Sequence, residues 1–473
     1  MFAKIQRIHF VGIGGIGMSG IAEVMLNLGY QISGSDLRHS AVTERLAGLG
    51  AIIFTGHVAG NISGADVIVT SSAISVDNSE VAEARRLHIP VIQRAEMLAE
   101  LMRLKYGIAI AGMHGKTTTT SMVAAVLAAG GLDPTVVVGG RVDALGSNAR
   151  LGKSQYLVAE ADESDRSFLK LSPILSVVTN IDREHMDCYR DMRDVRRTFL
   201  EFMERVPFYG VVVGCNDDAG LRRLLPRVHR RVTTYGTSRG SDFLIRMMNS
   251  HSGGSQGDSA PSCGMHNPVI CFQVTYKDKD LGEFTLRVPG THNVLNATAA
   301  IAVGTALDIP EEQIRSGLDG FRGVDRRFQF KGASAGVTVI DDYGHHPTEI
   351  RATLAAARQC GFRRVHVIFQ PHRFTRTRDL MDEFANAFGE ADTLSLLDIY
   401  PASEKPIAGI TAEALAERIA RAGRGKVSYA SSFADSVASV TTLAKPGDMI
   451  VTLGAGSVSQ LGTMILEKLE GGA

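Results

Sequence analysis

One stretch constrains the fold of this chain more than any other, residues 106–129 with the sequence YGIAIAGMHGKTTTTSMVAAVLAA. It predicts a buried strand, a glycine turn, a lysine followed by threonines, and then a helix. Backbone N–H groups of such a turn, continued into a helix N-terminus, form a positive hollow that suits the oxygens of a nucleotide polyphosphate. Lys116 would then reach the β- and γ-phosphates, and the Thr117 hydroxyl would ligate Mg²⁺.

This stretch differs from the usual phosphate-loop pattern at one position. The pattern places a glycine five residues before Gly115, where this chain has Ile110. The first glycine is instead Gly112, which predicts a shorter loop. A turn that merely links a strand to a helix is the alternative, but G-K-T-T after an apolar strand favours a phosphate site.

Composition limits the classes of protein to which the chain can belong. Its 473 residues are enough for about three domains, and a hydrophobic content of 44% supports cores of ordinary size. Equal numbers of basic and acidic residues, 50 of each, disfavour a general polyanion binder and therefore a nucleic-acid-binding role. Five scattered cysteines argue against a disulfide framework and a zinc site. Without a signal peptide or a membrane-length apolar run, we expect a cytoplasmic protein that does not contact a membrane.

A second glycine turn lies near the start of the chain, after a short apolar strand over residues 4–10. Gly12, Gly14 and Gly17 fit the dinucleotide-binding pattern G-x-G-x-x-G, and Gly15 lies in the same turn. Asp36 ends the next predicted strand, QISGSD, where it could hold a ribose hydroxyl. By motif alone NAD is the first guess, but the same turn accepts any pyrophosphate, including that of a nucleotide sugar. Tight packing of helix on strand without a ligand is a third interpretation.

Small polar residues follow the predicted strand over residues 65–70. Ser71 and Ser72 lie where an α/β sheet presents its ligand edge. A helical segment over 80–87 and a short strand from Pro90 come next, and we place the first domain boundary near Lys105.

Four acids follow the predicted strand over residues 155–159. They are Glu160, Asp162, Glu163 and Asp165. Without a cation they would repel one another, and a carboxylate in this position beside a phosphate loop is the usual second ligand of the nucleotide's Mg²⁺. A solvated acidic turn is the alternative.

His185 follows a further predicted strand, residues 174–179. A lone histidine is more often a surface or core residue than a ligand. Because the carboxyl ends of neighbouring strands share one edge of a sheet, we expect Lys116, the acids and His185 to converge there.

Two further segments complete the central part of the chain. Residues 249–268, rich in Ser, Gly, His and Pro, predict a mobile surface loop. Asn293 lies at the start of an alanine-rich helix, where it is either an N-cap or an amide that reads adenine.

The last part of the chain alternates strand and helix patterns, with strands predicted over 337–340, 364–369, 393–399, 426–429 and 449–453. Polar residues again follow the strands, and His372, Arg373 and Arg376 could form a carboxylate or phosphate clamp. The predicted fold class is α/β in three domains: an N-terminal Rossmann-like domain (1–105), a central P-loop ATPase-type sheet domain (106–328) and a C-terminal Rossmann-like domain (329–473).

Together, these motifs resemble the Mur ligases, the ATP-dependent amide-forming family of peptidoglycan synthesis. The resemblance spans nearly the whole chain and rests, in the family's order, on HFVGIGGIGMSG, AGMHGKTTTT, EADESD, TNIDREHMD, GTHNVLNA, RRF, DDYGHHP and FQPHRFTRT. The family uses the shorter phosphate loop, which accounts for Ile110.

The resemblance implies a role for each motif. It implies catalytic roles for Lys116, Glu160, His185 and Arg327. It implies ATP contacts at Gly112, Met113, His114, Gly115, Lys116, Thr117, Thr118, Asn293, Arg327 and Asp342, with Mg²⁺, or Mn²⁺ as an alternative, at Thr117, Glu160 and His185. It makes the first turn a UDP-sugar site of Gly12, Gly14, Gly15, Gly17, Asp36, Ser71 and Ser72, and we expect His345, His372, Arg373 and Arg376 to bind the amino acid.

The activity that the resemblance implies is the joining of L-alanine to the lactyl carboxylate of UDP-N-acetylmuramate through an acyl phosphate. A recycling ligase of the same family, which would join a ready-made peptide to that nucleotide sugar, is the nearest alternative. A P-loop regulatory ATPase and an NAD-dependent dehydrogenase are more distant alternatives. We expect a monomer or a weak homodimer.

Overall fold

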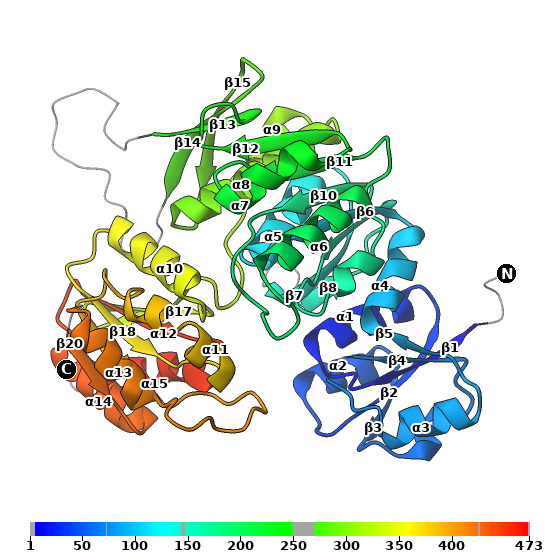
Figure 1. Cartoon of the computed structure of the whole chain (residues 1–473), viewed down its shortest axis with the longest axis horizontal. Coiled ribbons are helices and arrows are strands. Elements are labelled where there is room, and N and C mark those ends of the chain that lie inside the picture. Colours follow the sequence, from blue (N-terminus) through cyan, green and yellow to red (C-terminus); the bar gives the residue numbers. More distant parts are fainter. Residues whose placement is uncertain (1–4, 72, 143–146, 249–268, 424–425, 472–473) are drawn as a thin grey trace. The chain divides into compact units, whose positions relative to one another are not determined.

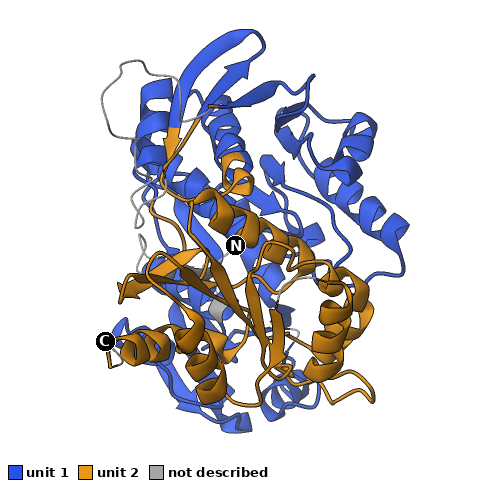
Figure 2. Cartoon of the chain, turned by 90° about the vertical axis from the view of Figure 1, so that its left-hand side faces the viewer, with its two compact units in different colours: residues 1–247, 272–284, 295–321 blue, residues 248–271, 285–294, 322–473 orange. Residues whose placement is uncertain are grey.

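The computed structural model describes residues 5–71, 73–142, 147–248, 269–423 and 426–471. Two predicted features, Ser72 and the segment 249–268, lie outside the described residues. The chain divides into two compact units (Figure 2), of which the first comprises residues 1–247, 272–284 and 295–321 and the second residues 248–271, 285–294 and 322–473.

A five-stranded parallel sheet opens the first unit (Figure 1). Its elements are β1 (Arg7–Val11), α1 (Ile16–Asn27), β2 (Gln31–Asp36), α2 (Ala41–Gly48), β3 (Ile52–Thr55), η2 (Ala59–Ile62), β4 (Val67–Thr70), α3 (Ser79–Arg86), β5 (Val91–Gln93) and α4 (Arg94–Arg103). The strand order is β3-β2-β1-β4-β5, so the order reverses between β1 and β4. In such a sheet a ligand binds beyond the carboxyl ends of the strands at this reversal.

A ten-stranded sheet follows, in the order β15-β14-β13-β12-β11-β10-β6-β9-β7-β8. Its elements are β6 (Tyr106–Ala111), α5 (Lys116–Ala129), β7 (Thr135–Val142), β8 (Ser147–Arg150), β9 (Tyr156–Glu160), η4 (Ser167–Lys170), β10 (Leu175–Val178), α6 (Met192–Glu204), β11 (Val211–Cys215), α7 (Ala219–Leu224), η5 (Leu225–Arg227), β12 (Val232–Gly236), β13 (Phe243–Met247), β14 (Ile270–Tyr276), β15 (Lys279–Leu286), α8 (Thr291–Ala306) and α9 (Glu311–Asp319). Strand β6 lies between β9 and β10 and is parallel to both. The carboxyl ends of these three strands therefore meet at one edge.

A six-stranded sheet forms the centre of the second unit, in the order β16-β17-β21-β18-β19-β20. Its elements are β16 (Gln329–Ser334), β17 (Val337–Asp342), α10 (Pro347–Gln359), β18 (Val365–Phe369), α11 (Phe374–Asp379), α12 (Met381–Ala385), β19 (Thr393–Leu396), α13 (Ala412–Arg421), β20 (Lys426–Tyr429), α14 (Phe433–Leu443), β21 (Met449–Leu453), η6 (Ser457–Gln460) and α15 (Leu461–Glu470). Strand β21 pairs in parallel with β17 on one side and β18 on the other. The polar segments after β17 and β18 thus start from the same edge.

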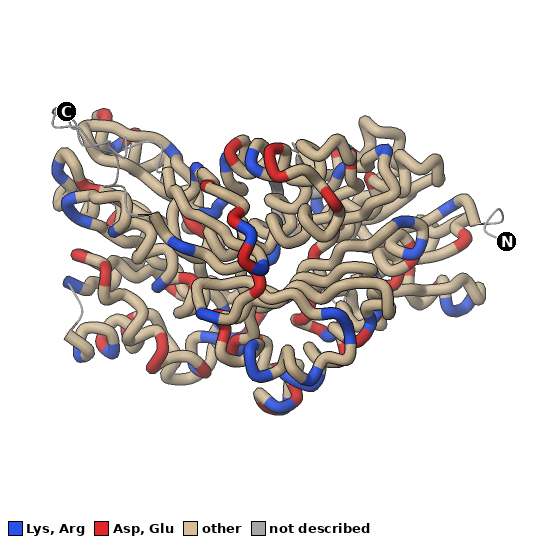
Figure 3. The backbone as a smooth tube through the Cα atoms, turned by 90° about the horizontal axis from the view of Figure 1, so that it is seen from above, with Lys and Arg blue, Asp and Glu red and all other residues tan. Residues whose placement is uncertain are grey.

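The predicted α/β class with three sheet-based parts is confirmed. The strands predicted over 31–36, 426–429 and 449–453 have these bounds in the structure. Basic and acidic residues are interspersed along the chain (Figure 3), in line with its formal net charge of zero. Among the described residues, no helix combines the length and apolar character needed to cross a membrane.

A fully buried carboxylate, that of Glu80 in α3, joins the elements around the first sheet. It accepts hydrogen bonds from Ser35 Oγ (2.6 Å) and Asn61 Nδ2 (2.7 Å), and His57 Nδ1 lies 3.2 Å from it. Burial works to raise the pKa of Glu80, but the interactions with His9, Ser35 and Asn61 outweigh burial and lower that pKa. Glu80 therefore stays charged and holds α3 against the end of β2.

We expect Glu80→Ala to lower the free energy of unfolding by roughly 3 kcal/mol, because several buried donors lose their acceptor at once. The midpoint of urea unfolding, followed by far-UV circular dichroism because the chain has no tryptophan, measures this change. Since the folded-state pKa is lowered, the stabilisation is present above the ordinary pKa of 4.5 and is lost as the pH falls through the folded value. The difference between the two proteins should therefore shrink in acid.

The matched control for this change is Glu83→Ala in the same helix. Glu83 forms an ion pair with Arg86 (2.7 Å) on the exposed side of α3. Its removal should change stability far less than removal of Glu80, because water screens an exposed ion pair. Equal effects of the two substitutions would contradict the role assigned to Glu80.

Candidate active site

The predicted phosphate loop connects β6 to α5. Gly112 and Gly115 have φ values of +132° and +82°, in the left-handed region that favours glycine. A Cβ atom on Gly112 would overlap Thr179 Oγ1, so the loop passes directly against the end of β10. Helix α5 begins at Lys116 and has no side-chain cap at Gly115. Its first N–H groups are therefore suited to an anion.

Residues that follow β10 hold the loop in this shape. His114 N donates to Asn180 Oδ1 (2.9 Å), and Asn180 Nδ2 donates back to His114 O (2.9 Å). Thr179 Oγ1 also donates to His114 O (2.6 Å), and His114 Nε2 lies 3.0 Å from Asp182 Oδ2. Sequence reasoning identified His114 as a loop residue but missed Asn180, whose partner lies far from it in the chain.

Lys116 lies on its own loop and against a buried acid. Its Nζ donates to Gly112 O (2.7 Å) and Met113 O (3.3 Å) and forms an ion pair with Glu163 Oε1 (2.7 Å). Burial works to lower the pKa of Lys116, but the charge of Glu163 and of neighbouring carboxylates outweighs burial and raises it. Lys116 therefore carries its positive charge at the loop.

The predicted metal ligands lie at the carboxyl edge of three adjacent strands. Thr117 follows the loop after β6, Glu160 ends β9, and His185 follows β10. His185 Nε2 lies 3.4 Å from Glu163 Oε1. The structure thus brings Lys116, the acidic segment and His185 to one edge, and the metal-binding role of these residues stays a prediction.

Asn296, in α8, also lies at the phosphate loop. A Cβ atom on Gly115 would lie 2.8 Å from Asn296 Oδ1. We assigned no role to Asn296 from the sequence, although it stands three residues after Asn293 in the segment GTHNVLNA. That spacing places it one helical turn further along the same face.

The first glycine turn is fixed by the end of β2. Gly12 N and Ile13 N donate to Ser35 O (2.8 and 3.0 Å), and Gly14 N donates to Asp36 Oδ2 (2.9 Å). Asp36 therefore lies at the turn, and both of its carboxylate oxygens accept backbone N–H groups, Oδ2 from Gly14 and Oδ1 from Arg38 (3.4 Å). Its contact with a ribose hydroxyl stays a prediction.

Arg94, the first residue of α4, links this turn to the acidic segment. A Cβ atom on Gly17 would lie 2.8 Å from Arg94 Nη1, and Arg94 Nη2 donates to Asp162 Oδ2 (3.0 Å). Sequence reasoning missed Arg94 because its two contacts lie far from it in the chain. Beside it is a hollow of about 240 Å³, whose lining includes Ser71, Asp165 and three basic side chains, Arg94, Arg166 and Lys170, each of which also pairs with an acid. These cations suit an anionic group.

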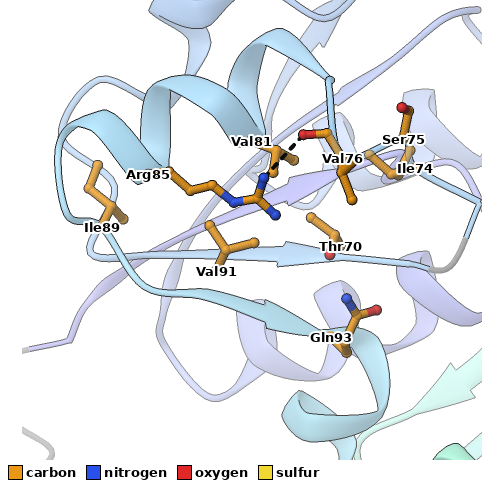
Figure 4. A pocket seen from close by; sticks show the side chains of 9 residues that line it. All are labelled: Thr70, Ile74, Ser75, Val76, Val81, Arg85, Ile89, Val91 and Gln93. Carbon is orange, nitrogen blue, oxygen red and sulfur yellow. Dashed lines mark hydrogen bonds between the residues drawn. The ribbon is translucent and has the colours of Figure 1, made fainter.

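A second hollow, of about 310 Å³, lies between α3 and strands β4 and β5 (Figure 4). Its lining is largely aliphatic, and its one basic side chain, Arg85, donates to Val76 O (3.3 Å). Gln93 lines both hollows. The lining of the basic hollow beside Ser71 therefore suits a phosphate better than the aliphatic lining of the second hollow.

In the second unit, the predicted amino-acid residues form an aromatic and basic cluster. The His372 ring stacks on Tyr400 (5.6 Å between centroids) and meets His345 edge-on (5.8 Å). Arg376 Nη1 lies 3.2 Å from His372 Nδ1. Burial, and then the electrostatic influence of His345 and of the Arg376 guanidinium, lower the pKa of His372 to about 3. His372 is therefore neutral near pH 7.

Arg373 belongs to the same cluster and has an unusual backbone. Its φ is +72°, and its Nε is shielded from solvent with no hydrogen-bond partner among the described residues. A left-handed non-glycine residue and a buried donor without an acceptor are both features that persist at functional sites.

The remaining predicted ATP contacts also lie in the second unit. Arg327 Nη1 donates to Glu349 Oε1 (3.2 Å), and Asp342 accepts from Phe328 N (2.7 Å) and Gly344 N (2.8 Å).

Helix α8 begins at Thr291, so the N-cap interpretation of Asn293 is wrong. The Asn293 side chain donates to Pro289 O (2.6 Å), because the chain turns back just before the helix. The ATP contacts of Arg327, Asp342 and Asn293 stay predictions.

Comparison with known proteins matches three successive family models to the chain. They are the Mur ligase family catalytic domain (residues 7–106), the Mur ligase middle domain (110–304) and the Mur ligase glutamate ligase domain (326–456). The UDP-N-acetylmuramate–L-alanine ligase of Koribacter versatilis is 70% identical over 99% of this chain and 98% of its own length. The enzyme of the same name from Acidobacterium capsulatum is 63% identical over 99% of each chain.

Solved structures give the same result. The UDP-N-acetylmuramate–alanine ligase of Thermotoga maritima is 28% identical, with a TM-score of 0.79 over 99% of this chain and 100% of its own. A murein peptide ligase from Psychrobacter arcticus shares the fold, with a TM-score of 0.68, 23% identity and coverage of 98% and 99%. The matches extend over both glycine turns and the third sheet, and the chain belongs to the Mur ligase family.

Proposed function

We propose that the chain joins L-alanine to the lactyl carboxylate of UDP-N-acetylmuramate, with cleavage of ATP to ADP and phosphate. One observation carries this proposal: two turns of the kind that bind phosphates lie in one unit and are linked through Arg94, which touches Gly17 and Asp162. That arrangement suits an enzyme that presents a nucleotide sugar to ATP. The relatives at 70% and 63% identity, both named UDP-N-acetylmuramate–L-alanine ligase, support the choice of substrates.

The reaction requires activation because a carboxylate and an amine do not condense in water. A lactyl oxygen attacks the γ-phosphorus of ATP, ADP leaves, and an acyl phosphate forms. The alanine nitrogen then attacks the acyl carbon and loses a proton, and the tetrahedral intermediate expels phosphate. No protein nucleophile takes part, so the protein contributes positioning and charge neutralisation.

Lys116 is the main cation that the protein supplies to the transferring phosphoryl group. It moves from Glu163 to the β- and γ-phosphates, while the loop N–H groups bind the phosphate oxygens. Thr117, Glu160 and His185 would hold Mg²⁺, with Mn²⁺ as an alternative, and oxygen and imidazole donors fit such an ion. The buried Oε2 of Glu163, which has no hydrogen-bond partner among the described residues, also fits a cation at this edge. When bound, the ion neutralises charge that develops on the phosphoryl oxygens.

The other substrates are assigned to the remaining clusters. The first turn and the basic hollow would bind the nucleotide sugar through Gly12, Gly14, Gly15, Gly17, Asp36, Ser71 and Ser72. Residues of the second unit, Asn293, Arg327 and Asp342, would contact ATP. His345, His372, Arg373 and Arg376 would bind the carboxylate of L-alanine, and the unpartnered Nε of Arg373 supports this assignment. The cytoplasmic location and the state of monomer or weak homodimer stay predictions.

Phosphate release in the presence of ATP, Mg²⁺ and UDP-N-acetylmuramate tests the activity, with L-alanine, glycine, L-serine and a tripeptide compared as amines. We expect the highest kcat/KM with L-alanine and almost no release without the nucleotide sugar. Preference for the tripeptide would instead identify a recycling ligase. Release without the nucleotide sugar would identify a regulatory ATPase.

We expect Lys116→Ala to reduce kcat by about a thousandfold or more, because the transferring phosphoryl group loses its protein cation. Circular dichroism checks that the variant is folded, and the phosphate assay measures kcat. Lys153→Ala, which removes an exposed lysine from the same part of the chain, is the control and should keep full activity. Near-normal synthesis by a folded Lys116→Ala protein would exclude Lys116 from catalysis.

We expect Arg376→Ala to raise the KM for L-alanine by about tenfold, because a charge-assisted contact with the carboxylate is lost. The KM for UDP-N-acetylmuramate should stay nearly constant. Arg378→Ala is the matched control, since Arg378 lies in the same helix and pairs with Asp379 (2.7 Å). An unchanged KM for L-alanine in Arg376→Ala would remove Arg376 from the amino-acid site.

A further inference from the structure

Glu163 is the most deeply buried acid at the phosphate loop, with 1% of its side chain exposed. Its backbone is anchored, because Tyr189 OH donates to Glu163 O (2.5 Å). Burial raises the pKa of Tyr189, so the hydroxyl keeps its proton and remains a donor. The Glu163 backbone is therefore held in place three residues beyond the end of β9.

The two carboxylate oxygens of Glu163 have unequal surroundings. Oε1 is bonded to Lys116 Nζ (2.7 Å) and lies 3.4 Å from His185 Nε2. Oε2 is shielded from solvent and has no hydrogen-bond partner among the described residues. A carboxylate oxygen has room for about two donors, and burial without a donor is unfavourable. The structure thus contains a buried acceptor that the protein itself leaves incomplete.

Lys116 is the one side chain that the structure shows in an ion pair shorter than 3 Å with this carboxylate, among the described residues. The proposed reaction requires Lys116 to move to the phosphates of ATP. The Glu163 carboxylate would then be left buried without its counter-ion, which is strongly unfavourable. Another cation must therefore replace Lys116 when the nucleotide binds.

The geometry at His185 indicates which cation this is. His185 is a proposed ligand of the nucleotide's divalent cation, and its Nε2 already lies 3.4 Å from the oxygen that Lys116 would release. The His185 backbone is held at φ +56°, in the left-handed region, so its ring is placed by the local fold at some cost in strain. Carboxylate oxygens are preferred ligands of Mg²⁺ and Mn²⁺.

We propose that Glu163 is a further ligand of the divalent cation, and that Lys116 occupies its carboxylate until ATP binds. Lys116 and the cation thus exchange places: the lysine moves to the phosphates, and the cation takes over the Glu163 oxygens beside His185. This inference rests on the proposed function, and it adds to it a ligand and an order of events. It also explains why a lysine that serves ATP is paired with a buried acid.

The first test is Mn²⁺ binding, measured by electron paramagnetic resonance of free Mn²⁺ with the full chain and a non-hydrolysable ATP analogue. Glu163→Gln keeps the size of the side chain and removes its charge, and we expect it to weaken binding of Mn²⁺ by about tenfold or more. Glu201→Gln is the control, because it makes the same change at an exposed acid of α6 that pairs with Arg205 outside the candidate site. It should leave the affinity within about twofold.

The second test uses Lys116→Met without nucleotide. If lysine and cation compete for Glu163, this variant should bind Mn²⁺ more tightly than the unmodified protein, and Mn²⁺ should raise its thermal unfolding midpoint. Lys116→Met combined with Glu163→Gln should show neither gain. A counter-ion with only a structural role would not produce these gains, and the test does not depend on Glu163→Gln folding by itself.

His185→Ala distinguishes failure of the Glu163 proposal from failure of the proposed metal site as a whole. If His185→Ala weakens Mn²⁺ binding while Glu163→Gln does not, and Lys116→Met shows no gain, Glu163 is not a ligand and the proposed metal site survives. If neither His185→Ala nor Glu163→Gln changes binding, the metal site itself is misplaced and both proposals fail. Weaker binding in both variants, with the gain in Lys116→Met, supports the exchange.

Discussion

The candidate site depends on one steric constraint, the close approach of Gly112 to the end of β10. A side chain at residue 112 would overlap Thr179 Oγ1, so the chain passes between β6 and α5 along a path open only to glycine. This close approach lets Thr179 and Asn180 bind both the N–H and the carbonyl of His114. These hydrogen bonds hold the loop in one shape, and N–H groups that are already in position bind phosphate at a smaller entropic cost.

The electrostatics of the site follow from the same geometry. The short loop brings Lys116 back over its own carbonyls, within reach of Glu163 in the segment that follows β9. A buried ion pair of this kind contributes little to stability, because desolvation offsets the attraction. Its presence is better explained by what the pair does during nucleotide binding than by what it adds to the fold.

Much of the architecture could be predicted from the sequence because hydrophobic periodicity is local. The strand QISGSD and the strand over 449–453 have the predicted bounds. Strands β7 and β16 were not predicted, since Gly139 and Gly140 interrupt the first and the second alternates polar and small residues. Strand β16 pairs with β17, and β7 pairs with β8 and β9, so pairing decides their structure where their own residue pattern does not.

The local motifs of the candidate site could be predicted from the sequence, but the contacts between these motifs could not. The motif around Lys116 and the four acids could be identified from residue type and spacing alone. Which acid meets the lysine could not, because Glu160, Asp162 and Glu163 differ only in the direction that the chain takes after β9. Arg94 gave no signal at all, as its contacts with Gly17 and Asp162 join distant segments. Long-range pairing of this kind is a property of the fold and not of a local pattern.

The position of Arg94 has a consequence for how this chain can be rearranged. Arg94 is the first residue of α4, the helix that leads from the first sheet to β6. Adding or deleting one residue in α4 would rotate the chain by about 100° per residue and shift the helix relative to either Gly17 or Asp162. Helix α4, which connects the two sheets, therefore has a fixed length and does not act as a flexible linker. A chimera that takes its first sheet from another family member must therefore keep an arginine in the place of Arg94 and an acid in the place of Asp162. The two sequences must be joined after Arg103.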